Sequence, residues 1–405
     1  MDEFYRKFGL RKVINARGPA TTLGSSRVSE KVRRDIYEML GRSVEMWELQ
    51  RKASEAIARL TGAEAGCVVG CSAAGMAVTA AAALTGGNMG WVKALPTVLG
   101  PKRKIVIQKG HIISVGDSSI SQVVRMTGAE VVEAGEALDC AKFYLEAALT
   151  DDVAAAMYVM GDKFPPNLLQ LEPFIEICKA RNVPVIIDAA YITDFRYLHE
   201  LGADLVVHSG QKWLGGATAG LIAGKKDLVH ACYMNDMGIG RPMKVGKEGV
   251  IGVISAIESW LARDQESIFA AQMQSFDHFQ GRLRQLPGLS LTVRRTIQSP
   301  SIRAELAVDE QVAGVEAWEL IFKFAKHDPV IKVDENGVDQ GRMTFDLTYL
   351  EEEEIDVIAA TIEQIIDDKR HHRNELKARP ERLTRMDALY QTHGKWLDEN
   401  PRHYE

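Results

Sequence analysis

Short apolar runs alternate with amphipathic segments along most of the chain. The segments ELQRKASEAIARLTG, which ends at Gly62, and LEPFIEICKARN, at 171–182, carry apolar residues at helical spacing and are predicted to be helices. Between such segments stand apolar runs typical of buried strands. The alternation predicts an α/β fold with a large, mostly parallel sheet and helices on both faces. The predicted strands cover residues 66–69, 104–108, 130–133, 155–160, 183–188, 204–207 and 219–223.

The pattern changes along the chain and suggests four parts. Residues 1–30 are expected to form an N-terminal arm, because INARGPATTLGSS is rich in small residues and turn formers. Residues 31–265 form the predicted large domain, and a long helical segment near 247–285 leads out of it. Residues 266–370 combine the strand-like runs LSLTVRR and RMTFDL with an acidic helix, which predicts a small C-terminal α+β domain. Residues 371–405 are a charged C-terminal extension.

Composition narrows the class of protein. The chain has 405 residues, of which 46% are hydrophobic and 26% charged, as in an ordinary globular protein, and its net charge of −6 argues against a general nucleic-acid binder. No apolar run is long enough to span a membrane, and MDEFYRKFGL lacks the apolar core of a signal peptide, so a cytoplasmic location is expected. The five cysteines follow no pairing or metal-binding pattern; buried thiols in a reducing compartment, and no metal site, are expected.

A carboxylate and a lysine follow two successive predicted strands. Asp188 ends the strand in VPVIIDAAY, and Lys212 follows the strand in ADLVVHSGQKWLGGATAGLIAG. Because ligands bind beyond the carboxyl ends of strands in an open α/β sheet, both side chains are expected at one site. Pyridoxal 5'-phosphate (PLP) needs such a pair: a lysine to form an imine and a carboxylate to keep the pyridine nitrogen protonated. The alternatives are an N-cap aspartate and a surface lysine, but the apolar and glycine-rich flanks of Lys212 predict partial burial, which lowers the pKa of an amine.

A phosphate site is predicted in VVGCSAAGMAVTAAAAL, which is expected to form a strand, a turn and an Ala-rich helix. Backbone N–H groups of Ser72, Ala73 and Ala74 would face an anion at the helix start, and the Ser72 hydroxyl could add a bond. Ser209 could reach the same phosphate, and the small side chain of Ala190 would let a flat ring lie over the strand end. An ordinary N-cap serine is the alternative for Ser72. The sequence holds no dinucleotide-binding fingerprint.

Other candidates concern the cofactor ring and the substrate. His111 follows the strand in KIVIQKGHIISVG and could stack on the cofactor, although a core or turn histidine fits the pattern nearly as well. Arg241 and Lys244, in MGIGRPMKVGKEG, and Arg342, in QGRMTF, would suit an anionic substrate, since arginine binds carboxylates through two bonds. Arg17, in VINARG, is a further substrate-binding candidate. Solvated basic loops are the alternative.

With these motifs assembled, residues 11–260 resemble PLP-dependent fold-type I enzymes. The branch they resemble is shared by bacterial selenocysteine synthase and the D-glucosaminate-6-phosphate ammonia-lyase group. The resemblance implies that Lys212 carries the cofactor, that Asp188 meets the ring nitrogen, and that Ser72–Ala74 hold the phosphate. It also matches Arg241 and Lys244, by their spacing from the lysine, with cations that bind anionic groups in selenocysteine synthase. The resemblance rests on VINARGPATTLG, ELQRKASEAIARLTGAEAGCVVGCSAAG, GADLVVHSGQKWLGGATAGLIAGKKDL and IGRPMKVGKEGVIGVISAIE.

Departures from selenocysteine synthase argue against a tRNA substrate. Selenocysteine synthase has an additional N-terminal domain for tRNA, whereas here the resemblance begins within about fifteen residues of Met1, and SVEMWELQ has no arginine between Arg42 and Arg51. Gln211 precedes Lys212 where that enzyme has an aspartate. The ammonia-lyase group matches better at ELQRKASEAIARLTGAEAG and SGQKWLGG.

The sequence therefore predicts a PLP-dependent lyase that performs α,β-elimination on a small β-hydroxy or sugar-derived amino acid, such as D-glucosaminate or its 6-phosphate. An amino-acid racemase or epimerase is the alternative, since it shares every step up to the carbanion; His111 is then the candidate second acid. A selenocysteine synthase-like transferase fits less well, and a non-catalytic scaffold predicts loss of the lysine, which is present. A small-molecule substrate and a homodimer or higher homo-oligomer are expected, with no nucleic acid and no membrane partner.

Overall fold

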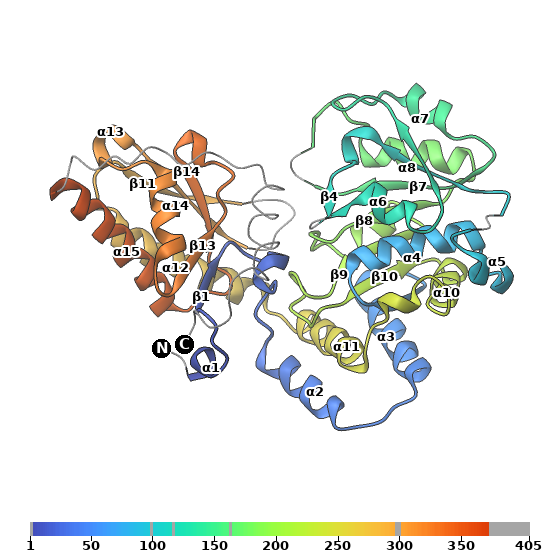
Figure 1. The fold of residues 1–405 in the computed structure, drawn as a ribbon, viewed down its shortest axis with the longest axis horizontal. Coiled ribbons are helices and arrows are strands. Elements are labelled where there is room, and N and C mark those ends of the chain that lie inside the picture. Colours follow the sequence, from blue (N-terminus) through green and yellow to red (C-terminus); the bar gives the residue numbers. More distant parts are fainter. Residues whose placement is uncertain (1–2, 98–99, 116–117, 162–163, 296–300, 372–405) are drawn as a thin grey trace. The chain divides into compact units, whose positions relative to one another are not determined.

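The larger of two compact units contains a seven-stranded sheet. The computed structural model describes residues 3–97, 100–115, 118–161, 164–295 and 301–371. Residues Pro19–Asp264 form this larger unit, and its sheet has the order β2-β10-β9-β8-β7-β3-β6 (Figure 1). Every predicted strand is present within about two residues of its predicted ends. The strands are β2 (Ala65–Val69), β3 (Lys104–Gln108), β6 (Glu130–Ala134), β7 (Val153–Val159), β8 (Val185–Asp188), β9 (Leu205–Ser209) and β10 (Gly220–Gly224).

All of these strands run in one direction except β10, which pairs antiparallel with both β2 and β9. Except in the edge strand β6, which keeps Glu130 and Glu133 exposed, nearly all side chains of these strands are buried on both faces, as the continuous apolar runs predict. Ile105 and Ile107 pack on one side with α4 (Ser72–Thr85) and α10 (Lys226–Asn235), whereas Val106 packs on the other side with α7 (Lys142–Ala148) and α8 (Leu171–Ala180). The predicted mostly parallel sheet with helices on both faces is thus confirmed.

Helices cover this sheet in two layers. One layer contains α4 (Ser72–Thr85), α5 (Met89–Ala94), α6 (Ile120–Arg125) and α10 (Lys226–Asn235). The other contains α2 (Glu30–Leu40), α3 (Met46–Thr61), α7 (Lys142–Ala148), α8 (Leu171–Ala180), α9 (Tyr197–Glu200) and α11 (Lys247–Leu261). The predicted helix ending at Gly62 is α3, and Gly62 takes the left-handed conformation (φ 74°) that closes a helix.

The smaller unit contains residues 3–18, 265–295 and 301–371 among those described. Its antiparallel sheet has the order β11-β12-β14, and β1 pairs in parallel with β13. These strands pack with α12 (Gln265–Leu283), α14 (Ala317–Lys326) and α15 (Glu352–His371) around their own core, with Phe279, Phe324 and Phe345 among its largest buried side chains. The strands are β1 (Val13–Ala16), β11 (Leu289–Arg294), β12 (Arg303–Val308), β13 (Val330–Val333) and β14 (Arg342–Asp346).

Two details differ from the sequence prediction. The helical segment near 247–285 is two helices, because α11 ends at Leu261 and α12 begins at Gln265, where the chain passes between the units. Asp264, directly before α12, is a residue type that favours a helix start. The first residues include β1, so this part of the predicted arm is a strand of the smaller unit. The four-part division itself stays a prediction, and residues 372–405 of the extension lie outside the described residues.

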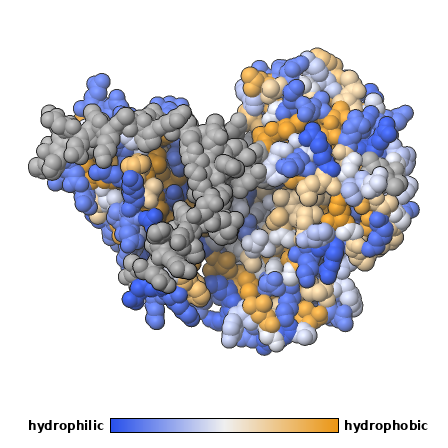
Figure 2. Space-filling view, viewed as in Figure 1, coloured by the Kyte–Doolittle hydropathy of each residue, from blue (hydrophilic) through white to orange (hydrophobic). Residues whose placement is uncertain are grey.

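On the face drawn in Figure 2, hydrophobic residues form separate patches among hydrophilic ones. In the described part of the chain, no helix combines the length and the apolar character needed to cross a membrane.

Candidate active site

Asp188 lies at the carboxyl edge of the large sheet. It is the last residue of β8, where it pairs with Val159 of β7 and Val207 of β9. Only 5% of its surface is exposed, and the Ala190 N–H donates to Oδ1 at 3.1 Å. Burial raises the pKa of Asp188, while the Lys212 charge and the Ala190 hydrogen bond oppose that rise. A buried carboxylate of this kind is stabilised by a further cationic donor.

Lys212 occupies the turn between β9 and β10 and is 7% exposed. Two hydrogen bonds from Ser26 hold this turn: its hydroxyl donates to the Lys212 carbonyl at 2.7 Å, and its N–H donates to the Gln211 carbonyl at 3.3 Å. Burial lowers the pKa of the Lys212 amine to about 8, against the opposing effect of the Asp188 charge. The predicted partial burial is therefore present, and the amine is poised near neutral pH.

The ring of Tyr191 lies over the amine of Lys212. Nζ is 3.3 Å from the ring centroid, which is a cation–π contact. Sequence reasoning missed this residue, although it ends the DAAY stretch that begins with Asp188. It missed Ser26 as well, and no local signal could find a partner 186 positions away in the chain.

The helix α4 begins beside β10, one of the two strands that the Lys212 turn connects. Its N-cap is Cys71, whose sulfur accepts the Ala74 N–H at 3.3 Å, so Ser72, Ala73 and Ala74 form the first turn and Ser72 is not the cap. Gly220, which pairs with Ser209 at the end of β9, lies against this turn. A Cβ at Gly220 would stand 2.4 Å from the Cys71 carbonyl oxygen and 2.8 Å from the Ser72 nitrogen. This close approach brings the helix N-terminus to Ser209; apart from the Ala74 N–H, which donates to Cys71, the N–H groups of a first helical turn have no partner within the helix and can bind an anion.

His111 joins the same edge through β7. It lies in a short 3-10 helix directly after β3, and its Nδ1 accepts the N–H of Val159, the partner of Asp188, at 3.3 Å. Its ring contacts Tyr158 edge-on and Phe164 at a tilt, with both centroids at 4.5 Å. Burial lowers the pKa of His111 to about 4, so the ring is neutral at pH 7, with its proton on Nε2.

The loop that carries Arg241 and Lys244 reaches the start of this site. A Cβ at Gly70, in the turn before α4, would lie 2.5 Å from the Met243 carbonyl oxygen and 3.6 Å from that of Lys244. Both cationic side chains are exposed. The larger unit thus brings several predicted site residues to one edge of its sheet. They are Lys212, the Asp188 carboxylate, the first turn of α4, Ser209, His111 and the loop that carries Arg241 and Lys244.

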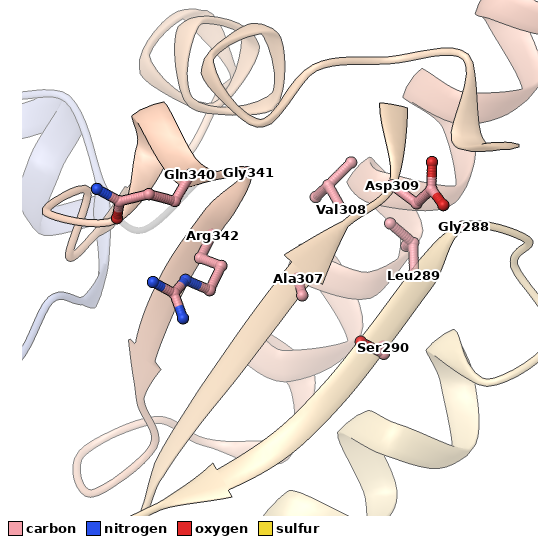
Figure 3. Close-up of a pocket in the computed structure, with 9 residues that line it drawn as sticks. All are labelled: Gly288, Leu289, Ser290, Ala307, Val308, Asp309, Gln340, Gly341 and Arg342. Atoms are coloured by element: carbon pink, nitrogen blue, oxygen red, sulfur yellow. The ribbon is translucent and has the colours of Figure 1, made fainter. Parts of the chain in front are cut away.

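Arg17 and Arg342 belong to the smaller unit. Arg17 is exposed and follows β1. Arg342 begins β14, its side chain is 47% exposed, and Nη1 lies 4.0 Å from Glu305 of β12. It also lines a cavity of about 500 Å³ beside the small sheet, where Figure 3 draws it on the strand next to Ala307. All lining residues of this cavity come from the smaller unit, whereas Lys212 belongs to the larger one.

Fold and site together define a PLP-dependent enzyme of fold type I. The family model described as "SelA: L-seryl-tRNA selenium transferase" matches residues 13–286, and the chain belongs to this family. Pyridoxal 5'-phosphate is the cofactor that the family and the fold indicate.

Two relatives are similar along most of their length. D-glucosaminate-6-phosphate ammonia lyase of Salmonella typhimurium (strain 14028s / SGSC 2262) is 31% identical over 86% of this chain and 97% of the relative. A 5'-C-glycyluridine monooxygenase-decarboxylase of Streptomyces sp. is 33% identical over 89% of this chain and 92% of the relative. A solved structure of D-glucosaminate-6-phosphate ammonia-lyase superposes with a TM-score of 0.82 at 28% identity, covering 91% of this chain and 99% of that one.

Proposed function

We propose that the chain is a PLP-dependent lyase that eliminates the β-substituent and then ammonia from a small β-hydroxy or sugar-derived amino acid. D-glucosaminate and its 6-phosphate are the leading substrates. The observation that carries this proposal is the similarity to the ammonia lyase, which extends over 97% of that enzyme in sequence and over 99% of the solved chain.

The residues of the larger unit fit the cofactor. Lys212 would attach it, and the buried Asp188 carboxylate would accept the N–H of a protonated pyridine ring, which supplies the donor that this carboxylate needs. The first turn of α4, from Ser72 to Ala74, would hold the phosphate with help from Ser209. When bound, PLP supplies an electron sink that makes the proton on the substrate Cα acidic.

Lys212 is the proposed base. Because burial lowers the pKa of its amine to about 8, a usable fraction of the free amine is unprotonated near neutral pH and can accept the Cα proton. The resulting ammonium can return that proton to the departing hydroxyl group. Loss of the β-group, followed by hydrolysis that releases ammonia, leaves a 2-oxo acid. We assign Arg241 and Lys244 to the anionic or polyhydroxyl end of the substrate and Arg342 to its carboxylate, with Arg17 as a further substrate-binding candidate.

The alternatives differ in how well the site supports them. Oxidative decarboxylation is a second candidate, because the Streptomyces relative is 33% identical over 92% of its length. Racemisation fits less well: its second acid would be His111, whose ring is neutral at pH 7, with a pKa of about 4. We further propose a cytoplasmic homo-oligomer that acts on a small molecule and not on nucleic acid or membranes, in keeping with the net charge of −6.

The test is a substrate panel with three readouts. Purified protein is given D-glucosaminate with and without a 6-phosphate, and D- and L-β-hydroxy amino acids, while ammonia, 2-oxo acid and dissolved oxygen are followed. Ammonia and 2-oxo acid in equal amounts, without oxygen uptake, are expected. The Lys212→Ala variant should lose both products and the visible absorption of the bound cofactor.

Other outcomes identify other reactions. Oxygen uptake with carbon dioxide release would replace the lyase by the oxidative decarboxylase. Inversion at Cα without ammonia would replace it by a racemase. Full activity in Lys212→Ala would remove Lys212 from the mechanism.

A further inference from the structure

Lys212 has one contact at its backbone and another at its side-chain amine. Ser26 binds the backbone of its turn, whereas the ring of Tyr191 faces the amine, with Nζ 3.3 Å from the ring centroid. Tyr191 is 47% exposed and the lysine 7% exposed, so the ring lies between the buried amine and the surface. An amine over a ring face interacts most strongly when it carries its proton, because the negative face of the ring attracts a cation.

The turn that ends β8 fixes the place of this ring. The Ala190 N–H donates to the Asp188 carboxylate, and the Ile192 N–H donates to the Ala189 carbonyl at 3.0 Å. Tyr191 stands between these two bonds, so the turn that fixes the carboxylate also fixes the ring. The charge that acts on the Lys212 amine comes from Asp188. The amine therefore has an anion and an aromatic face nearby, both of which favour its protonated form.

We propose that Tyr191 is a positioning residue whose ring face holds the protonated amine of Lys212. The meaning of this contact in catalysis rests on the proposed function. After Lys212 accepts the substrate Cα proton, the ring stabilises the resulting ammonium and keeps it over the site until the proton is passed on. In this proposal the aromatic ring of Tyr191, and not its hydroxyl group, stabilises the ammonium of Lys212.

The experiment measures the free amine directly in full-length protein from which the cofactor has been removed. The acetylation rate of Lys212 is followed against pH by mass spectrometry of the peptide that carries it, in wild type, Tyr191→Phe and Tyr191→Leu. Leucine covers the amine without an aromatic face, so the midpoint should fall by about half a pH unit to one and a half. Phenylalanine keeps the face and should leave the midpoint near its wild-type value.

Tyr197→Leu is the matched control, because Tyr197 is another exposed tyrosine of the same unit, bonded to Glu172 at 2.8 Å. It should leave the Lys212 midpoint unchanged, and circular dichroism checks that each variant is folded. An unchanged midpoint in Tyr191→Leu overturns the proposal, and a rise shows that the ring only excludes water. A fall in Tyr191→Phe would assign the effect to the hydroxyl group. Because no substrate is present, failure of the lyase reaction leaves this measurement intact.

Discussion

Asp188 and Lys212 illustrate how two buried groups of opposite charge can prepare a site for chemistry. Burial disfavours both charges, lowering the pKa of the amine and raising that of the carboxyl, while each charge partly offsets the effect on the other. Such an arrangement is costly for stability and useful for proton transfer. The strand-end position of Asp188 and the turn position of Lys212 make the pair a direct product of the sheet topology.

Asp188→Asn tests this coupling at the residue scale. The amide keeps an acceptor for the Ala190 N–H but removes the negative charge that raises the pKa of Lys212. The acetylation midpoint of Lys212 in cofactor-free protein should therefore fall below about 8, by about one pH unit. Turnover of the loaded enzyme should fall at least about 100-fold, since the ring nitrogen loses its anionic partner.

Asp204→Asn is the matched control for this variant. Asp204 is also buried, and it bonds the Val185 N–H at 2.7 Å and Lys225 at 2.6 Å, at the opposite ends of the same strands. Asp204→Asn should lower the free energy of unfolding without shifting the pH midpoint of Lys212 acetylation. Equal midpoints in wild type and Asp188→Asn would show that the two groups are not coupled.

The sequence predicted the candidate cofactor-binding side chains, but not the residues that contact them in the folded chain. Lys212 and Asp188 were predictable because each follows an apolar run, and strand ends are where such groups gather. Tyr191 and Ser26 were not predictable, because their roles depend on contacts that only the folded chain creates. The Cys71 cap was missed because cysteine is not among the favoured cap residues.

At the scale of elements, the approach of α4 to β10 shapes the predicted phosphate site. Gly220→Ala should disturb it, because the new Cβ would stand 2.4 Å from the Cys71 carbonyl oxygen and force the start of α4 away. We expect PLP affinity to fall at least about tenfold, which is about 1.4 kcal/mol. Equilibrium titration of the cofactor-free protein with PLP, followed by absorbance, measures the change.

Gly281→Ala serves as the control, since Gly281 lies in α12 and a Cβ there meets nothing within 4 Å. This change should leave PLP affinity unchanged and stabilise the helix by about 1 kcal/mol. Unaltered affinity in Gly220→Ala would mean that the first turn of α4 does not hold the phosphate.

The elements of the two units were predictable to different degrees. Apart from the edge strand β6, the strands of the large sheet are buried on both faces, so they appear in the sequence as continuous apolar runs. In the smaller unit, buried and half-buried residues alternate along β12 as in a strand, but RAELAV is short and consists mainly of good helix formers, so its sequence is harder to separate from a helix. The pairing of β1 with β13 joins residues more than 300 positions apart, which no local pattern reveals.

At the scale of the whole molecule, buried histidines distinguish the two units. In the larger unit, burial lowers the pKa of His111 and His199 to about 4 and that of His208 to about 3. Both ring nitrogens of His208 are buried, and a backbone interaction with Ala189 only partly opposes the effect of burial on the pKa of this ring. In the smaller unit, His278 bonds Asp356 at 2.9 Å and His327 bonds the Pro329 carbonyl at 2.9 Å. We therefore expect low pH to destabilise mainly the larger unit.

Whether stability rises or falls with pH depends on which state, folded or unfolded, binds more protons. Between about pH 6.5 and pH 4, these three histidines are protonated in the unfolded chain but neutral in the folded one, so stability falls as pH decreases through this range. At pH 5 each histidine lowers the free energy of unfolding by about 2 kcal/mol.

Hydrogen exchange read by mass spectrometry should show the large sheet opening at a pH where α12 and α15 remain protected. His208→Phe, which preserves the ring contact with Phe195, should reduce the loss by about one third, whereas changing the exposed His230 to Gln should not. Simultaneous opening of both units, or an equal loss in His208→Phe and wild type, would rule out the buried histidines as the cause.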